Sequence, residues 1–220
     1  MQTKDELKAY CDLIRSELNS KYSDAMYQVF MPWLEAMPNN NYGLINSDNF
    51  FKQGYLLSFT ENADISFSIP TILDNLSKGL LNTSRGVVGS KESIVFSAEY
   101  IAPLADDYAS ILAVEFPVSV KDLLNTKPYI IDGNKRISQA MQKGFLGAVS
   151  YILIEPHSFD SFCFTDFYSR FILLFTYDMV MVIKNEDHEH VLSVVSGVVR
   201  RLADGYPSFF DALKNSASLL

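Results

Sequence analysis

Apolar residues recur every three to four positions near the start of this chain, and that period predicts helices. One helix is predicted over residues 3–22, where Thr3 and Glu6 have the spacing of a capping box. A second helix is predicted over 23–37. The Pro- and Asn-rich stretch 38–43 then predicts a loop that ends this helical lead-in.

From residue 50 to residue 154 the apolar positions form short runs and alternations, which predict strands interspersed with helices. In chain order, the predicted elements are two strands within 50–70 with a turn at 61–63, a helix over 69–82, strands at 92–101, 110–120 and 128–132, a helix over 133–143 that stops at Gly144, and a strand at 148–154. The segment 83–91, TSRGVVGSK, is interpreted as a flexible connector. This order predicts an α/β fold with a mixed sheet, with α+β as the alternative.

The remainder of the chain is aromatic at first and helical in pattern later. The period of residues 157–175 fits a helix and a strand equally well, whereas 188–213 predicts a helix interrupted by Gly205 and Pro207. The predicted organisation is a helical lead-in at 1–42, an α/β domain at 43–156 and a C-terminal extension at 157–220 that packs on the same core.

Composition narrows the class of protein. Of 220 residues, 48% are hydrophobic and 20% are charged, which is typical of a globular chain and excludes a disordered one. The net charge is -8 and the pI is about 4.8, so nonspecific binding of duplex DNA is not expected. Such binding gains its affinity when basic side chains neutralise DNA phosphates.

Cysteine use and hydropathy predict a cytoplasmic protein. Cys11 and Cys163 are far apart and have no metal-ligand spacing, which favours reduced thiols in a core. The N-terminus lacks the pattern of a secretory signal. The longest apolar run, 171–183, is too short to span a bilayer and contains Asp178, so no membrane association is expected.

The segment PYIIDGNKRISQAMQKG, residues 128–144, carries the clearest candidate chemistry. A strand that turns directly into a helix places unpaired helix N–H groups beside the strand's end, where they can hold an anion. Gly133 would let a ligand approach the backbone, and Lys135 and Arg136 would add positive charge. Asp132 could orient Arg136, accept N–H bonds from the helix, or contact a ligand hydroxyl or a bridging metal.

The same residues have a purely structural interpretation. Asp-Gly is a common turn dipeptide, and Asp132 could serve only as the N-cap of the helix. The spacing alone does not decide between a turn and a binding site.

The segment YIIDGNKRISQAMQKGFLGAVSYILI resembles the signature of the ParB/sulfiredoxin-like superfamily. In that family a strand leads into an Asp-Gly-x-His/Arg-Arg hinge, a helix, a glycine and a further strand. The matching positions are Asp132, Gly133, Arg136, Ala140 and Gly144, and the similarity extends over about residues 92–155.

The resemblance implies a small α/β domain whose hinge binds nucleotide phosphates. By position, the binding residues would be Asp132, Gly133, Asn134, Lys135 and Arg136. Members of the family variously hydrolyse or sense CTP, use ATP in phosphoryl transfer or cut nucleic acid. The implied cofactors are therefore ATP or CTP with Mg²⁺, and whether this chain is an enzyme stays open.

Departures from the family limit what can be carried over. Asn134 stands where sulfiredoxins place their reactive cysteine, so repair of cysteine sulfinic acid is excluded at this position. The arginine that segregation proteins place early in the domain is also missing, so that Arg85 or Lys91 would have to replace it. Residues 157–220 do not resemble a helix-turn-helix DNA reader either.

Three further groups of residues have weaker interpretations. Asp106 and Asp107 could bring Mg²⁺ to bound phosphates or form an exposed acidic loop. The run 186–190, EDHEH, could bind a divalent metal or solvate a helix start, and no metal site is predicted from it. His157, just beyond a strand end, is expected near the hinge if the sheet is parallel there.

Two functions from different classes follow from these observations. The first is a ParB-like protein that binds a nucleotide or another phosphate ligand at residues 132–136, as a hydrolase, a phosphotransferase, a nuclease or a sensor. The second is a non-catalytic acidic interaction protein, such as an immunity protein or an antitoxin, that covers a basic protein partner.

Overall fold

The structure, a computed structural model, describes residues 4–17, 54–60, 63–96, 110–119, 122–145, 147 and 149–185. The helices in these ranges are α1 (Lys4–Glu17), α3 (Ile69–Ser77), α4 (Asn134–Gln142) and α5 (Phe167–Asn185). The strands are β1 (Gly54–Thr60), β2 (Ala63–Ser68), β3 (Thr83–Val87), β4 (Leu112–Ser119), β5 (Asp122–Asp132) and β6 (Ser150–Ile154). Short 3-10 turns lie at η1 (Lys91–Ser93), η3 (Pro156–Ser158) and η4 (Ser161–Cys163).

The larger sheet has four strands in the order β3-β6-β4-β5. Strands β4 and β6 are parallel, whereas the β3–β6 and β4–β5 pairs are antiparallel. The predicted mixed sheet in a mixed α/β chain is therefore confirmed. Strands β1 and β2 form a separate antiparallel pair, and Val95 makes an isolated bridge to Tyr129 on the outer side of β5.

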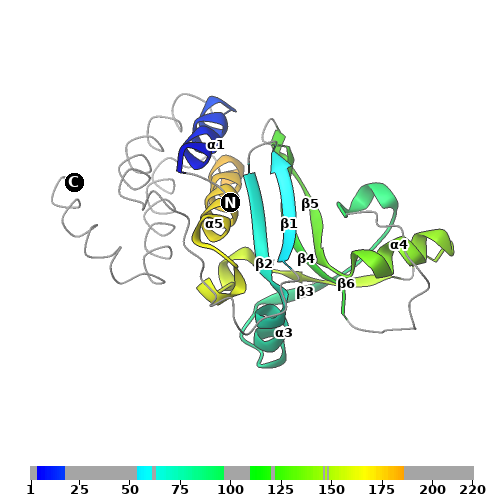
Figure 1. Cartoon of the computed structure of the whole chain (residues 1–220). Helices are drawn as coiled ribbons and strands as arrows, with labels where there is room; N and C mark the ends of the chain where they lie inside the picture. The colour runs from blue at the N-terminus through cyan, green and yellow to red at the C-terminus, as the bar shows by residue number, and fades with distance from the viewer. Residues whose placement is uncertain are drawn as a thin grey trace.

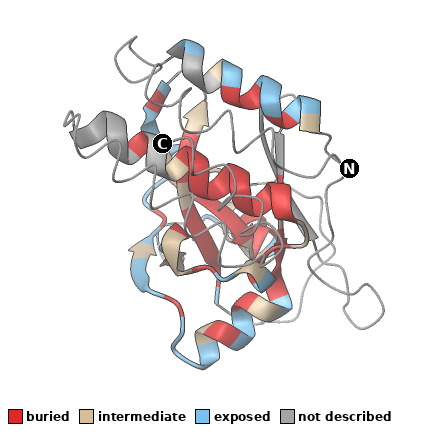
Figure 2. Ribbon diagram, turned by 90° about the vertical axis from the view of Figure 1, so that its left-hand side faces the viewer, coloured by how far each residue is buried: buried red, intermediate tan, exposed pale blue. Residues whose placement is uncertain are grey.

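The sheet has a hydrophobic cluster on each face because successive side chains of a strand point to opposite sides. Along β4, Leu112 and Val114 belong to the larger cluster with α1, β2 and α5, whereas Ala113 belongs to the smaller one with Ile137 of α4. Figure 1 shows α5 and α4 on opposite sides of the sheet. The first half of α5, residues 167–176, is buried throughout and runs through the centre of the molecule (Figure 2).

Several predicted elements are confirmed within the described ranges. The first helix is present as α1, the two strands predicted within 50–70 are β1 and β2, and the strand at 110–120 is β4. Helix α3 begins at Ile69 as predicted but ends five residues early, at Ser77. Gly79 has φ 68, and the bonds Leu80 N–H to Asn75 C=O and Gly79 N–H to Leu76 C=O end the helix in a Schellman motif.

Other predictions were wrong or incomplete, and one had left helix and strand open. Residues 83–91 are not a flexible connector, because 83–87 pair with β6 as strand β3. Residues 91–93 form a 3-10 turn closed by a reciprocal Ser90–Ser93 capping box, so the strand predicted at 92–101 is absent over its first residues. Strand β5 starts at Asp122, six residues before the predicted start. The ambiguous segment 157–175 is helical from Phe167 onward.

Some predictions concern residues outside the described ranges. These are the helix at 23–37, the loop at 38–43, the Asp106–Asp107 pair, the acidic run at 186–190 and the helix at 188–213. None of the described helices is both long enough and apolar enough to cross a lipid bilayer.

Candidate functional site

The predicted strand–hinge–helix unit is present at residues 122–142. Strand β5 ends at Asp132, Gly133 is the N-cap with φ 93, and α4 begins at Asn134. No side chain caps this helix, so Asp132 is not its N-cap as the structural interpretation proposed. The five candidate residues thus lie together where the strand becomes a helix.

Gly133 is required by packing inside the protein. Its φ of 93 lies in the region that L-residues with a side chain rarely adopt. A Cβ atom here would lie 2.8 Å from Cγ1 of Ile111 and 3.2 Å from Nη2 of Arg136. The glycine therefore lets the backbone approach the side chains of its own fold, which is a sufficient reason for its presence without a ligand.

Asn134 also has an internal role. It is 3% exposed, and its Nδ2 donates a hydrogen bond to the carbonyl oxygen of Ile130 at 3.2 Å. This bond ties the first residue of α4 back to β5 and fixes the angle between strand and helix. The Asn134 side chain is thus directed into the hinge.

Charge at the hinge is partly neutralised within the protein. Nη2 of Arg136 lies 3.2 Å from Oδ2 of Asp132, and the two side chains are 19% and 27% exposed. This pair supports the role of Asp132 in orienting Arg136. Lys135 is exposed, so the hinge has one exposed cation and one half-buried cation held by a carboxylate.

Strand directions separate other predicted residues from the hinge. Arg85 is level with Asp132 in the sheet, through Ile152 and Leu112, but lies three strand spacings away, about 14 Å. Arg85 is therefore not beside the hinge, where it would have to lie to replace the missing family arginine. The expectation that His157 lies near the hinge was wrong. Strand β6 runs antiparallel to β5, so its C-terminal end, which His157 follows, lies at the opposite end of the strands from the hinge.

The end of the sheet away from the hinge, where β6 finishes and β3 begins, holds a cleft that no sequence motif indicated. Its volume is about 250 Å³, and we call it the acidic cleft. It is lined by Asn82, Thr83, Ser84, Glu115, Leu153, Ile154, Glu155, Pro156 and Tyr177. Thr126 Oγ1 donates to Oε1 of Glu115 at 2.5 Å, and Asn82 Nδ2 donates to Oε2 of Glu155 at 3.1 Å. The lining contains two carboxylates held by neutral donors and no lysine or arginine.

One signal could have indicated the acidic cleft from sequence. Glu115 stands in the apolar run LAVEFPV, where a charge within a buried strand needs a polar partner or access to water. In the structure Glu115 is half-buried. Burial raises the pKa of Tyr151 above its usual value, and the negative charge of Glu115 adds to this effect. Glu155 comes forty residues later, so only the fold brings the two acids to one cleft.

The cysteines are built as core residues. Cys11 and Cys163 are free and buried, and burial raises the pKa of both thiols, that of Cys163 to about 12. Cys163 Sγ accepts a hydrogen bond from Asn75 Nδ2 at 3.4 Å. Within the described ranges, neither thiol has the lowered pKa that a reactive cysteine requires.

Comparison with known proteins gives no relative. No family model, no curated protein and no solved structure matches the chain. Among the described residues, no group of three or more His, Cys, Asp or Glu side chains is placed to hold a metal ion.

Proposed function

We propose that the protein binds a phosphate group, as part of a nucleotide or of another ligand, at the hinge formed by residues 132–136. The observation that supports this most is the start of α4, where no side chain caps the helix and Lys135 is exposed. The N–H groups of the first turn and the helix dipole both favour a negative charge there. The family resemblance of the segment supports the same site.

The proposal gives Asp132 a specific role. Its carboxylate holds Arg136 in place but competes with any anion for the guanidinium. A bound phosphate must therefore share Arg136 with Asp132 or displace it. Because the pair is only half-buried, opening it costs less than opening a fully buried pair.

Thermal unfolding with ATP, CTP and inorganic pyrophosphate, each with and without Mg²⁺, tests the proposal. A ligand that binds only the native state must raise the melting temperature. Arg136→Ala is expected to weaken the Kd about 10- to 100-fold, equivalent to 1.5–3 kcal/mol for hydrogen bonds to charged groups. Asp132→Asn is expected to strengthen binding, because it releases Arg136 from its carboxylate.

Lys78→Ala is the matched control. Lys78 forms an exposed ion pair with Asp74 four residues away, the same spacing as the Asp132–Arg136 pair, on a different helix. This variant should bind as the wild type does. If no phosphate compound stabilises the wild type, the proposal is wrong. If stabilisation survives Arg136→Ala unchanged, the ligand binds elsewhere.

A second candidate function is favoured by the charge distribution. The chain carries a net charge of -8, and Asp132 already neutralises the most buried cation of the hinge. These facts support a non-catalytic protein whose acidic surface binds a basic partner, since complementary charge speeds and selects association. This candidate would be favoured over the first if the chain binds a basic protein with an affinity that falls steeply as salt is added, and if nucleotides do not change its melting temperature.

A further inference from the structure

Strand β3 forms an exposed edge of the four-stranded sheet. It pairs with β6 on one side, and no other described strand pairs with it. Four of its five residues, Thr83, Ser84, Arg85 and Val87, are exposed, and Val87 reaches 62%. The register with β6 is continuous from Thr83 to Val87 without a bulge.

Three of the five residues of β3 direct their backbone N–H and C=O groups away from the sheet. The residues that flank β3 are hydrogen-bonded to the residues that flank β6. Glu155 N–H donates to Asn82 C=O just before β3, and Val88 N–H donates to Val149 C=O just after it, both at 2.9 Å. Residues in an antiparallel pair alternate between bonded and non-bonded positions. The non-bonded positions, whose N–H and C=O groups face outward, are therefore Thr83, Arg85 and Val87.

A bond on the other side of β6 agrees with this assignment. Ile152 is the partner of Arg85, and its N–H donates to the carbonyl of Ile111 at 2.8 Å, toward β4 and away from β3. The Arg85–Ile152 pair is thus a non-bonded one.

The edge lacks most features that keep edge strands from pairing with other chains. It has no proline and no bulge, and Arg85 is its one charged residue. It is short, but its outward N–H and C=O groups are regularly spaced. Such an edge is a template for an added strand.

The acidic cleft adjoins this edge. Thr83 and Ser84, the first two residues of β3, are part of its lining. The Glu155 carboxylate accepts a bond from Asn82, so it lies directly at the start of β3. A lysine or arginine side chain on a strand added to β3 would find a carboxylate there, without a competing cation among the lining residues.

We propose that the β3 edge and the acidic cleft together dock an extended segment of a partner protein that carries a lysine or arginine. The segment adds as a strand to β3 through the outward groups of Thr83, Arg85 and Val87, and its basic side chain enters the acidic cleft toward Glu155. This inference rests on the second candidate function, for which it names the surface, and it is independent of the hinge.

Selection of random nine-residue peptides, displayed on phage, against the immobilised full chain tests the proposal. Enriched peptides should alternate β-branched or aromatic residues with other types and share a lysine or arginine. Val87→Pro removes an outward N–H without breaking a bond to β6, so it should weaken these peptides at least about tenfold. The matched control Val87→Thr keeps the N–H and should bind within about twofold of wild type.

Two more variants keep the test decisive if Val87→Pro disturbs folding. Thr83→Pro removes another outward donor, and Glu155→Gln removes charge from the cleft while keeping an acceptor for Asn82. Glu155→Gln should weaken peptides with lysine or arginine about threefold or more, and it should not affect their derivatives with glutamine in that place.

Each contrary result has a distinct meaning. Selected basic peptides that bind Val87→Pro and Thr83→Pro as tightly as wild type overturn the docking site but leave the second candidate function standing. A selection without any enriched basic peptide overturns both. If the free chain is a dimer that Val87→Pro converts to a monomer, the edge is occupied by a second copy and the proposal is wrong.

Discussion

At the scale of single residues, Gly133 and Gly144 at the two ends of α4 have different constraints. Both have positive φ, 93 and 73, but a Cβ at Gly133 would meet Ile111 at 2.8 Å, whereas at Gly144 it would have no neighbour within 4 Å. Gly144 completes a Schellman motif, with Phe145 N–H bonded to Ala140 C=O. Conformation alone explains the second glycine, while conformation and packing together explain the first.

Gly133→Ala should therefore lower the free energy of unfolding more than Gly144→Ala. We expect about 1–2 kcal/mol for either alanine in the left-handed region and roughly 1–3 kcal/mol more at Gly133 for overpacking. Urea unfolding followed by far-UV circular dichroism measures both values. Equal losses would show that the Ile111 contact relaxes without cost.

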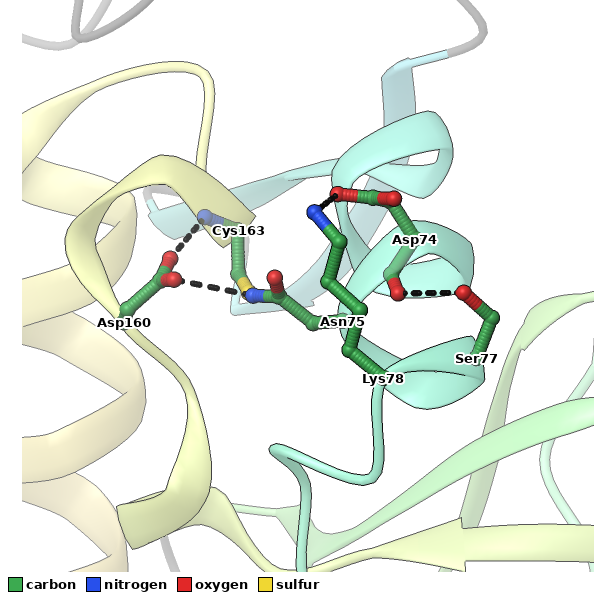
Figure 3. A network of polar contacts seen from close by, with 6 residues as sticks. All are labelled: Asp74, Asn75, Ser77, Lys78, Asp160 and Cys163. Atoms are coloured by element: carbon green, nitrogen blue, oxygen red, sulfur yellow. Dashed lines mark hydrogen bonds and ion pairs between the residues drawn. The ribbon is translucent and has the colours of Figure 1, made fainter.

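At the scale of elements, a polar contact joins α3 to η4 across 85 residues of sequence. Asn75, which is 6% exposed, donates from Nδ2 to Oδ2 of Asp160 at 2.8 Å. The other oxygen of Asp160 accepts the backbone N–H groups of Phe162 and Cys163 at 2.9 and 3.0 Å. Figure 3 shows Asp160 bridging the two segments, with the Lys78–Asp74 pair on the outer side of α3. One carboxylate thus both caps η4 and holds α3.

Asn75→Ala should cost about 1–3 kcal/mol of stability, because it removes a buried partner of a carboxylate. Asp74→Ala on the same helix should cost at most about 1 kcal/mol, since it breaks only an exposed ion pair. A double-mutant cycle between Asn75→Ala and Asp160→Ala should give a coupling of about 0.5–3 kcal/mol. Additive losses would mean that the two side chains do not interact in solution.

At the scale of the whole molecule, one core joins the N-terminal helix α1 to the late helix α5 and to the sheet. Leu7, Tyr10 and Cys11 of α1 belong to the same cluster as residues 171–175 of α5. The Tyr10 hydroxyl is also hydrogen-bonded to Oγ1 of Thr176. The N-terminal helix is therefore part of the core that supports the sheet.

This core predicts loss of stability at alkaline pH. Burial raises the pKa of Tyr10 and Cys11, that of Tyr129 to about 12 and that of Cys163 to about 12. The folded state keeps these protons longer than the unfolded state, whose thiols ionise near pH 9. Their contribution is complete below that pH and is lost progressively as the pH rises toward 12.

The free energy of unfolding should therefore fall by about 1.4 kcal/mol per pH unit for each buried thiol above pH 9, and for each buried tyrosine only above pH 10. Cys163→Ala should reduce this slope by the contribution of one thiol, about 1.4 kcal/mol per pH unit. Urea titrations at several pH values measure the slope for both proteins. A slope that Cys163→Ala leaves unchanged would show that this thiol ionises alike in the folded and unfolded states.

The sequence by itself determined features that depend on near neighbours. The hinge was predictable because its three signals lie close together in the sequence: a short apolar run, then the turn dipeptide Asp132-Gly133, then a helical apolar stripe that ends at Gly144. The same local rules located α1, β1, β2 and β4. They failed at 83–87, because TSRGV has few strand-forming residues and becomes a strand only through its pairing with β6.

Only the tertiary structure decided which distant residues meet, because strand order and direction depend on contacts across the whole core. It set β6 antiparallel to β5, which sends His157 away from the hinge, and it brought Ile111 against Gly133. It also left β3 at the edge and joined Glu115 and Glu155 in one cleft. No local pattern encodes these contacts, since each forms between segments that meet only when the sheet assembles.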